Sequence, residues 1–210
     1  MIAWQYLDYL GVAVFAITGG LVAARLRQDF IAFLFFCTLT GIGGGTLRDL
    51  LLGAPVFWTQ NESYLIVCAA ASVLMWFTAH LFERIDKPVR WMDAVGIAAY
   101  CVMGAAKALS MGEHYFVAVP MGVATATCGG IIRDIVAGQP SAISQREVYV
   151  AATCGGAGTF VALKAAGVDE NIAAAAGFAV AMILRGGALQ FGWYLPGYTP
   201  WGEKREPKKD

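Results

Sequence analysis

The sequence predicts an all-α polytopic membrane protein with seven transmembrane helices, arranged as two inverted three-helix repeats plus a seventh helix. Three observations support this fold class. Hydrophobic residues make up 58% of the 210 residues and charged residues only 14%, which is too few charges to cover a soluble surface. Apolar runs of roughly 20 residues, long enough to cross the hydrocarbon core, recur along the chain. A motif of glycines followed by Arg-Asp occurs twice, 85 residues apart.

The predicted helices fill the chain as a single transmembrane domain of residues 1–210. Repeat one (7–82) contains helices at 7–24, 30–52 and 64–82, and repeat two (91–166) contains helices at 91–111, 115–137 and 148–163. The seventh helix covers 171–191, and a charged cytoplasmic tail follows at 192–210. Lys107, Lys164 and Arg185 shorten the uncharged runs of three helices, but long basic side chains near helix ends can reach the membrane interface.

The duplication is visible when each residue is paired with the one 85 positions later. Between positions 8 and 64, 15 of 57 ungapped pairs are identical. The identities concentrate on Gly, Arg, Asp and Pro, which an apolar bias in composition does not explain, so we infer a true internal repeat. Because three crossings is an odd number, the second repeat enters the bilayer from the opposite side, and the repeats are inverted.

The basic residues predict the orientation in the membrane. Ten fall on one side of the predicted helices, and only Lys107 and Lys164 lie near the other side. The positive-inside rule therefore places the N-terminus outside and the C-terminus in the cytoplasm. The ten are Arg25, Arg27, Arg84, Lys87, Arg90, Arg146, Lys204, Arg205, Lys208 and Lys209.

Composition and motifs argue against several classes of function. The formal net charge is zero and the dense charged run is the tail, so we expect no nucleic-acid partner. His80 and His114 have no Cys or carboxylate at ligand spacing, so we expect no metal site. The Gly-rich segment 41–46 lacks the features of a dinucleotide loop, and no nucleophile, base and orienting residue form a hydrolase site. We expect neither an enzyme nor a cofactor.

The duplicated motif supplies the candidate functional residues. Glycine inside a helix favours a kink, and ionisable groups inside a membrane usually face a wet cavity on an ion or substrate path. The predicted kink positions are Gly43, Gly44, Gly45, Gly129 and Gly130. The predicted pore and gating residues are Arg48, Asp49, Arg133, Asp134 and Lys107.

Other interpretations of these charges stay open. On a straight helix Arg48 lies roughly 27 Å from the helix start, close to the far interface, where it would simply reach water. Adjacent side chains diverge by about 100° on a helix, so we expect Arg48 to face Asp134 or a freed carbonyl of the second motif, and Arg133 to face Asp49, as a gate or as a purely structural lock.

Three residues outside the motif also have candidate roles. Lys107 is a candidate voltage sensor, with snorkelling to the interface as the alternative. Asp8 and Asp93 match across the repeats, and we expect them to cap helix N-termini.

At the paired Gly-Gly-x-x-Arg-Asp segments, and at the Pro55-Val56-Phe57-Trp58 segment after the first, the chain resembles bacterial members of the trimeric intracellular cation (TRIC) channel family. The domain of that family is also labelled a glycine transporter. The resemblance covers about residues 7–191. It implies a homotrimer in the bacterial inner membrane, with a potassium-permeable pore in each subunit between the glycine-kinked second and fifth helices. Potassium, other small monovalent cations and membrane lipids are the implied partners.

The resemblance also places the Arg and Asp residues of both motifs beside the pore. Animal members carry a lipid-binding Lys-Glu-Val sequence where this chain has Gly-Gly-Gly, so we do not expect the same phosphoinositide regulation.

We therefore expect a passive, weakly selective channel for monovalent cations, because balanced Arg and Asp residues leave no surplus acidic ring. Transport of a small zwitterion such as glycine is the alternative, since an Arg and an Asp can receive its carboxylate and ammonium groups. A third hypothesis is a bundle without permeation, in which the charges only lock the helices. Single-channel currents would favour the channel and saturable uptake would favour the transporter. The absence of both would leave the locked bundle.

Overall fold

The computed structural model describes residues 2–82, 86–140 and 148–195. Within these ranges the chain forms eight helices, and six of them are long and apolar enough to cross a membrane. The seventh apolar helix, α7, has 16 residues. The helices are α1 (Ile2–Arg25), α2 (Phe30–Leu51), α3 (Phe57–Gln60), α4 (Ser63–Phe82), α5 (Asp86–Ser110), α6 (Tyr115–Val136), α7 (Val150–Ala165) and α8 (Glu170–Phe191).

The seven predicted helices are all present, and the structure adds the short helix α3 between the second and third of them. Helix α1 begins at Ile2 and α5 at Asp86, both earlier than predicted. Asp8 and Asp93 therefore lie inside helices, and their predicted role as N-caps is wrong. The side chains of Asp29 and Asp169 cap α2 and α8 instead, by accepting from backbone N–H groups at 2.8 and 2.9 Å.

Part of the charge pattern used for orientation falls beyond the described ranges. Most of the predicted tail 192–210 does so, as do six of the ten basic residues on the predicted cytoplasmic side. Those six are Arg84, Arg146, Lys204, Arg205, Lys208 and Lys209, and the side chain of Lys87 is also outside the description.

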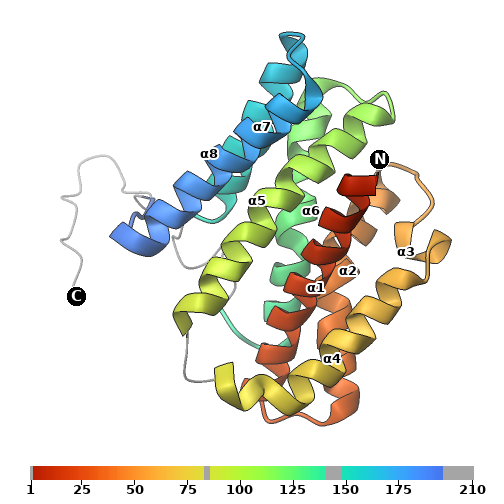
Figure 1. Ribbon diagram of the computed structural model, residues 1–210, viewed down its shortest axis with the longest axis vertical. Coiled ribbons are helices and arrows are strands. Elements are labelled where there is room, and N and C mark those ends of the chain that lie inside the picture. The colour runs from red at the N-terminus through yellow and green to blue at the C-terminus, as the bar shows by residue number, and fades with distance from the viewer. Residues whose placement is uncertain (1, 83–85, 141–147, 196–210) are drawn as a thin grey trace, which may run out of the picture.

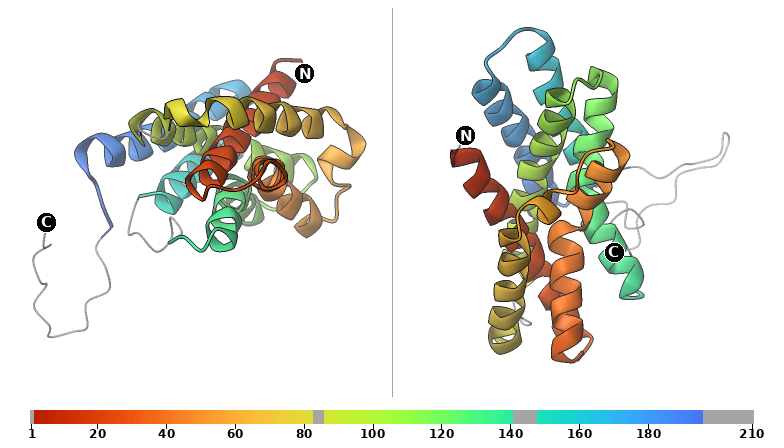
Figure 2. Two further views of the ribbon diagram at one scale, coloured as in Figure 1. Left: turned by 90° about the horizontal axis from the view of Figure 1, so that it is seen from below. Right: turned by 90° about the vertical axis from the view of Figure 1, so that its right-hand side faces the viewer.

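The two halves of the chain have matching helices that run in opposite directions. In Figure 1, α1 runs down the page and α2 returns up it, whereas α5 runs up and α6 returns down. Helices α2 and α6 pack against each other between the halves, and α8 packs on α5 and α7. The turned views in Figure 2 show the same bundle from below and from the side. The opposite directions agree with a repeat of three crossings.

The duplication also appears in the packing of the core. A Cβ on Gly11 would lie 2.6 Å from the Tyr100 ring, and a Cβ on Gly96 would lie 3.4 Å from the Phe15 ring. Each of these glycines matches the other across the 85-residue offset, and so do the two aromatic residues. The rings of Phe15 and Tyr100 stack with centroids 5.3 Å apart, so the same contact is made from both halves.

Candidate functional site

The two motifs meet where α2 crosses α6. A Cβ on Gly44 would overlap the backbone carbonyl oxygen of Thr125, and a Cβ on Gly129 would lie 2.7 Å from the carbonyl oxygen of Thr40. Gly44 matches Gly129 and Thr40 matches Thr125 across the repeat. The halves therefore make one reciprocal contact, which only glycine permits, because any side chain would push the helix backbones apart.

The other motif glycines face different neighbours. A Cβ on Gly45 would lie 2.7 Å from the Phe57 ring, whereas one on Gly43 would make an ordinary contact of 3.6 Å with the Cα of Gly129. A Cβ on Gly130 would come no closer than 3.5 Å to its neighbours. Both α2 and α6 continue as α-helix through these glycines. The bends expected there stay a prediction, and the observed role of Gly44, Gly45 and Gly129 is close packing.

In the first motif, the fully buried carboxylate of Asp49 is surrounded by donors. Its Oδ1 lies 2.7 Å from Nη2 of Arg48 and 3.0 Å from Nζ of Lys107. Its Oδ2 accepts from the backbone N–H of Phe57 at 2.9 Å, which fastens α3 to α2. The side chain of Arg48 is only 8% exposed, so it is buried in the protein and does not extend to an interface.

In the second motif, Arg133 contacts its own neighbour in the same way. Its Nε and Nη2 donate to Oδ1 of Asp134 at 2.9 and 2.7 Å, and its Nη1 donates to Oγ1 of Thr18 at 3.0 Å. Thr18 belongs to α1, in the other half of the chain. In both motifs, the guanidinium group of the arginine therefore pairs with the carboxylate of the next residue on the same helix.

The predicted crossed pairs, Arg48 with Asp134 and Arg133 with Asp49, are wrong. Adjacent Cβ atoms diverge around a helix, but a long arginine side chain can fold back along the helix surface to the next carboxylate. One ionic link between the halves is instead the contact of Lys107 on α5 with Asp49 on α2. This link has no repeat partner, since Val22 is the residue that matches Lys107.

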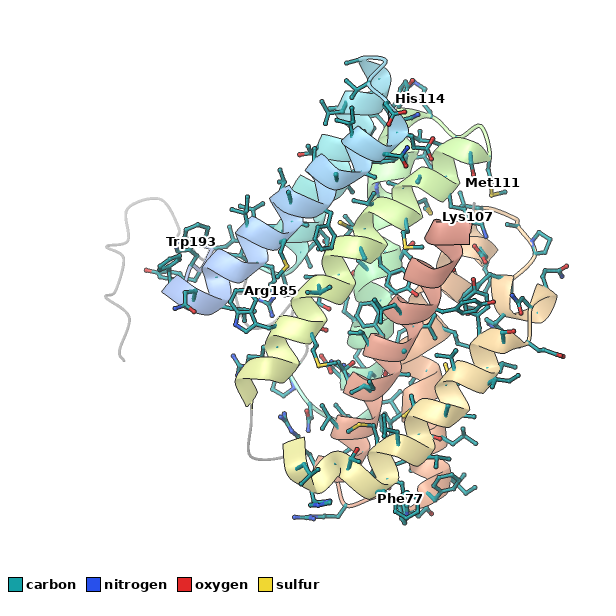
Figure 3. All side chains as sticks on the ribbon, in the orientation of Figure 1. Phe77, Lys107, Met111, His114, Arg185 and Trp193 are labelled. Carbon is teal, nitrogen blue, oxygen red and sulfur yellow. The ribbon has the colours of Figure 1, made fainter. Side chains whose placement is uncertain are left out.

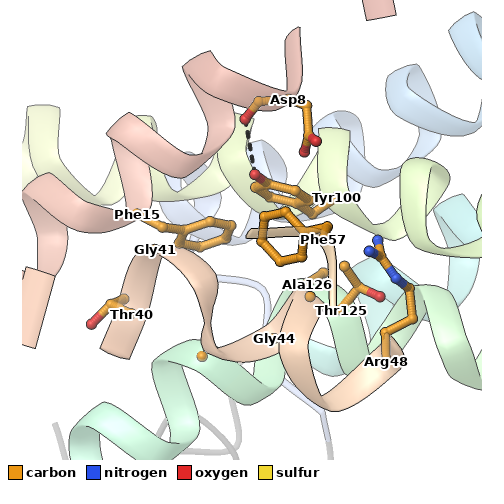
Figure 4. Close-up of a pocket in the computed structure, with 12 residues that line it drawn as sticks. Asp8, Phe15, Thr40, Gly41, Gly44, Arg48, Phe57, Tyr100, Thr125 and Ala126 are labelled. Carbon is orange, nitrogen blue, oxygen red and sulfur yellow. Dashed lines mark hydrogen bonds between the residues drawn. The ribbon is translucent and has the colours of Figure 1, made fainter. Parts of the chain in front are cut away.

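A narrow cavity of about 10 Å³ lies beside the crossing (Figure 4). This volume is at the lower limit for a single water, so the cavity is narrow in this structure. Asp8 lies at one end, where its backbone carbonyl accepts from the Tyr100 hydroxyl at 3.0 Å and its carboxylate accepts from the Tyr64 hydroxyl at 2.6 Å. Arg48 and Phe57 also line the cavity, and the guanidinium lies 5.9 Å from the centre of the Phe57 ring.

A second, wider cavity of about 210 Å³ lies on the other side of the crossing. Neighbouring residues of α6 line the two cavities, Gly129 the narrow one and Gly130 the wide one. The charged residues that line the wide cavity are Arg25, Arg90, Asp93, Arg133, Asp134 and Arg185. The duplicated motifs are therefore each associated with a polar cavity.

Several residues of the site were not predicted from the sequence. Phe57, Trp58 and Thr46 form one group, in which the indole N–H of Trp58 donates to the Thr46 hydroxyl at 2.9 Å. Tyr64 and Asp8 form another, and both match identical residues across the repeat. Identity across the repeat was thus the signal that could have identified the second group.

These features define a helical membrane protein built from two matching halves, with ionisable groups buried where the halves meet. A model of the family described as "Glycine transporter" matches the chain twice, at residues 5–80 and 90–165, and the chain belongs to this family. The two matches confirm the internal duplication.

Relatives and solved structures agree with this assignment. The chain is 36% identical over 200 residues to the UPF0126 inner membrane protein YadS of Escherichia coli K12, covering 92% of this chain and 95% of the relative. It is 41% identical to the TRIC channel orthologue from Rhodobacter sphaeroides, with a TM-score of 0.88 and coverage of 92% and 100% of the two chains. A second solved structure, described in terms of conductance through TRIC cation channels, is 30% identical with a TM-score of 0.86, covering 97% of this chain and 98% of that one. The chain therefore has the fold of prokaryotic TRIC channels.

Proposed function

We propose that this protein is a potassium-permeable channel for small monovalent cations, a homotrimer with one pore in each subunit between α2 and α6. The observation that carries this proposal is the arrangement at the crossing, where buried Arg-Asp motifs and polar cavities lie on the two sides of a close glycine contact. Intramembrane ionisable groups of this kind usually mark an ion path. The likeness to solved TRIC cation channels supports the same conclusion.

The pore would conduct after the crossing widens. The narrow cavity holds at most about one water, so ions need a small separation of α2 from α6. The glycines are the proposed hinges for this movement, because they allow bending where neighbouring groups rescue the backbone. Near-balanced charges from Arg48, Asp49, Arg133 and Asp134 would give weak discrimination among small cations.

Lys107 is the proposed gating residue. Its ammonium group contacts Asp49 at 3.0 Å, and its side chain is 32% exposed, so it can leave this contact without crossing the protein core. A unit charge moved through 100 mV gains about 2.3 kcal/mol, which is enough to shift the occupancy of a weak contact. Arg48 would keep Asp49 paired while Lys107 moves.

We further propose that the chain lies in the bacterial inner membrane with its N-terminus outside, its C-terminus in the cytoplasm and lipids around the trimer. The supporting observation is that Arg25, Arg27 and Arg90, near the end of α1 and the start of α5, belong to one side of the bundle. The positive-inside rule assigns that side to the cytoplasm.

Transport of glycine or a similar zwitterion is the alternative, favoured by the description of the matching family. Planar-bilayer recording of the purified protein in asymmetric KCl, with and without glycine, tests the choice. For a channel we expect discrete currents that reverse toward the potassium equilibrium potential. These currents should be unaffected by glycine. Silent bilayers combined with saturable uptake of labelled glycine into liposomes would overturn it.

A further inference from the structure

We infer that the side chain of Phe57 closes the narrow cavity and sets the size of cation that can pass, an inference that rests on the proposed channel function. Phe57 is the first residue of the short helix α3, and it lines this cavity together with Gly45 and Arg48. Figure 4 shows its ring among the lining residues. The cavity of about 10 Å³ holds at most one water, and the ring takes the space that further waters would need.

Contacts on three sides hold the ring of Phe57. A Cβ on Gly45 would lie 2.7 Å from the ring, so the ring packs directly on the backbone of α2. The guanidinium of Arg48 lies 5.9 Å from the ring centre, within the range of a cation–π contact. The ring of Tyr64 meets it edge to face, with centroids 4.7 Å apart. Together these contacts fix both the position and the orientation of the ring.

Two hydrogen bonds attach α3 to the first motif. The backbone N–H of Phe57 donates to Oδ2 of Asp49 at 2.9 Å, and the indole N–H of Trp58 donates to the hydroxyl of Thr46 at 2.9 Å. Lys107, which Figure 3 labels on α5, contacts the other carboxylate oxygen of Asp49 at 3.0 Å. The closing side chain and the proposed gating residue are therefore attached to the same carboxylate.

The repeat supplies an internal comparison that lacks the ring. Pro55 and Gln60, on either side of Phe57, are identical to the residues 85 positions later, which fixes the alignment of the segment between them. The residue that matches Phe57 in the sequence is Ala142. The second half therefore has no aromatic side chain at this position.

The cavities of the two halves differ in the direction that this comparison predicts. Gly130 matches Gly45 across the repeat. A Cβ on Gly130 would come no closer than 3.5 Å to any described neighbour, whereas one on Gly45 would lie 2.7 Å from the ring of Phe57. The cavity lined by Gly130 has about 210 Å³, and the cavity lined by Gly45 has about 10 Å³. The narrow cavity is thus the one that contains the ring.

A neutral ring in a narrow path discriminates by size. Pore diameter and the groups that line the pore determine which ions pass. A potassium ion needs only the small widening of the crossing already proposed, whereas a bulky cation such as tetramethylammonium also needs the space of the ring. The substitution Phe57→Ala gives the first half the residue type of the second half and should remove this size limit.

Planar-bilayer recording with potassium on one side and tetramethylammonium on the other tests the size limit, because the reversal potential gives the relative permeability. We expect Phe57→Ala to raise the relative permeability of tetramethylammonium about tenfold, since overlap with a packed side chain costs enough for a factor of this size. Phe57→Leu keeps part of the side-chain volume and should give a smaller rise. Gln60→Ala is the matched control, because Gln60 is exposed on the same helix and does not line the cavity. An unchanged relative permeability in Phe57→Ala would overturn the inference.

Chemical access to the cavity gives a second measurement that needs no current. Thr125 lines the narrow cavity and is 4% exposed, so Thr125→Cys places a thiol inside it. In nanodiscs, we expect a water-soluble methanethiosulfonate to modify this thiol about tenfold faster when Phe57→Ala is also present, because a packed group reacts only when the structure opens locally. Mass spectrometry measures the rate, and Phe57→Ala without the added thiol controls for the five native cysteines. Equal rates with and without Phe57→Ala would contradict the closure.

The two measurements separate this inference from the proposed function. If the parent and all variants carry no potassium current while the thiol rate rises, the channel is overturned and the closure by Phe57 stands. If the parent conducts potassium but neither the permeability ratio nor the thiol rate changes, the closure is overturned and the channel stands. If Phe57→Ala does not fold, Phe57→Leu takes its place in both measurements, with smaller changes in the same direction.

Discussion

Replacing Gly44 with alanine would test the crossing of α2 and α6. An added Cβ would lie well inside the 3.0 Å that real Cβ contacts essentially never cross, and the opposing atom is the backbone carbonyl oxygen of Thr125. That oxygen can move only together with α6. Overpacking costs about 1–3 kcal/mol, and the higher helix propensity of alanine returns up to about 1 kcal/mol. We therefore expect Gly44→Ala to lower the free energy of unfolding by up to about 2 kcal/mol and to change the conductance.

Gly43 offers a matched control on the preceding position of the same helix. A Cβ on Gly43 would lie 3.6 Å from the Cα of Gly129, an ordinary contact, so Gly43→Ala should be neutral or stabilising by up to about 1 kcal/mol. Unfolding of both variants by sodium dodecyl sulfate in mixed micelles, followed by circular dichroism, measures the difference. Equal unfolding midpoints for the two variants would refute the tight packing assigned to Gly44.

Three further substitutions test the ionic and polar contacts. Asp49→Asn leaves Arg48 buried beside a neutral amide, so we expect a loss of about 3–5 kcal/mol in the same unfolding assay, and a loss under about 1 kcal/mol would contradict the buried ion pair. Lys107→Met should change the voltage dependence of the current with little effect on stability, because Asp49 keeps its arginine partner; identical current-voltage curves would exclude the gating role. Tyr64→Phe removes the hydroxyl that donates to Asp8 at 2.6 Å and should cost about 1 kcal/mol, so an unshifted unfolding midpoint would count against that hydrogen bond.

The long helices could be predicted from the sequence because hydropathy reports directly on membrane-spanning segments. The starts of α1 and α5 were placed too late, since the polar residues near their first turns lie outside the apolar runs but still belong to the helix. The short helix α3 was missed because four residues are fewer than any periodic pattern needs. Its position depends on a tertiary contact, the hydrogen bond from the Phe57 N–H to Asp49.

The candidate residues could be found through the duplication, but their partners could not. Helix geometry gives the direction of each Cβ and not the reach of a flexible arginine, so the pairing of Arg48 with Asp49 was mispredicted. The contact between Lys107 and Asp49 joins residues that are distant in sequence and breaks the repeat symmetry. Neither periodicity nor internal comparison can predict such a contact, because it depends on how the two halves pack.

The short length of α7 has a consequence for the surrounding membrane. A straight helix of 16 residues rises about 24 Å, less than the ~30 Å hydrocarbon core, whereas its counterpart α4 has 20 residues and rises about 30 Å. On the predicted topology of seven crossings, a bilayer of ordinary thickness matches α4, whereas α7 would be accommodated by local thinning of the bilayer or by flanking side chains that extend to the interface. Shorter lipid acyl chains would then relieve the mismatch at α7 and not at α4, so membrane thickness would act on the two halves of the molecule unequally.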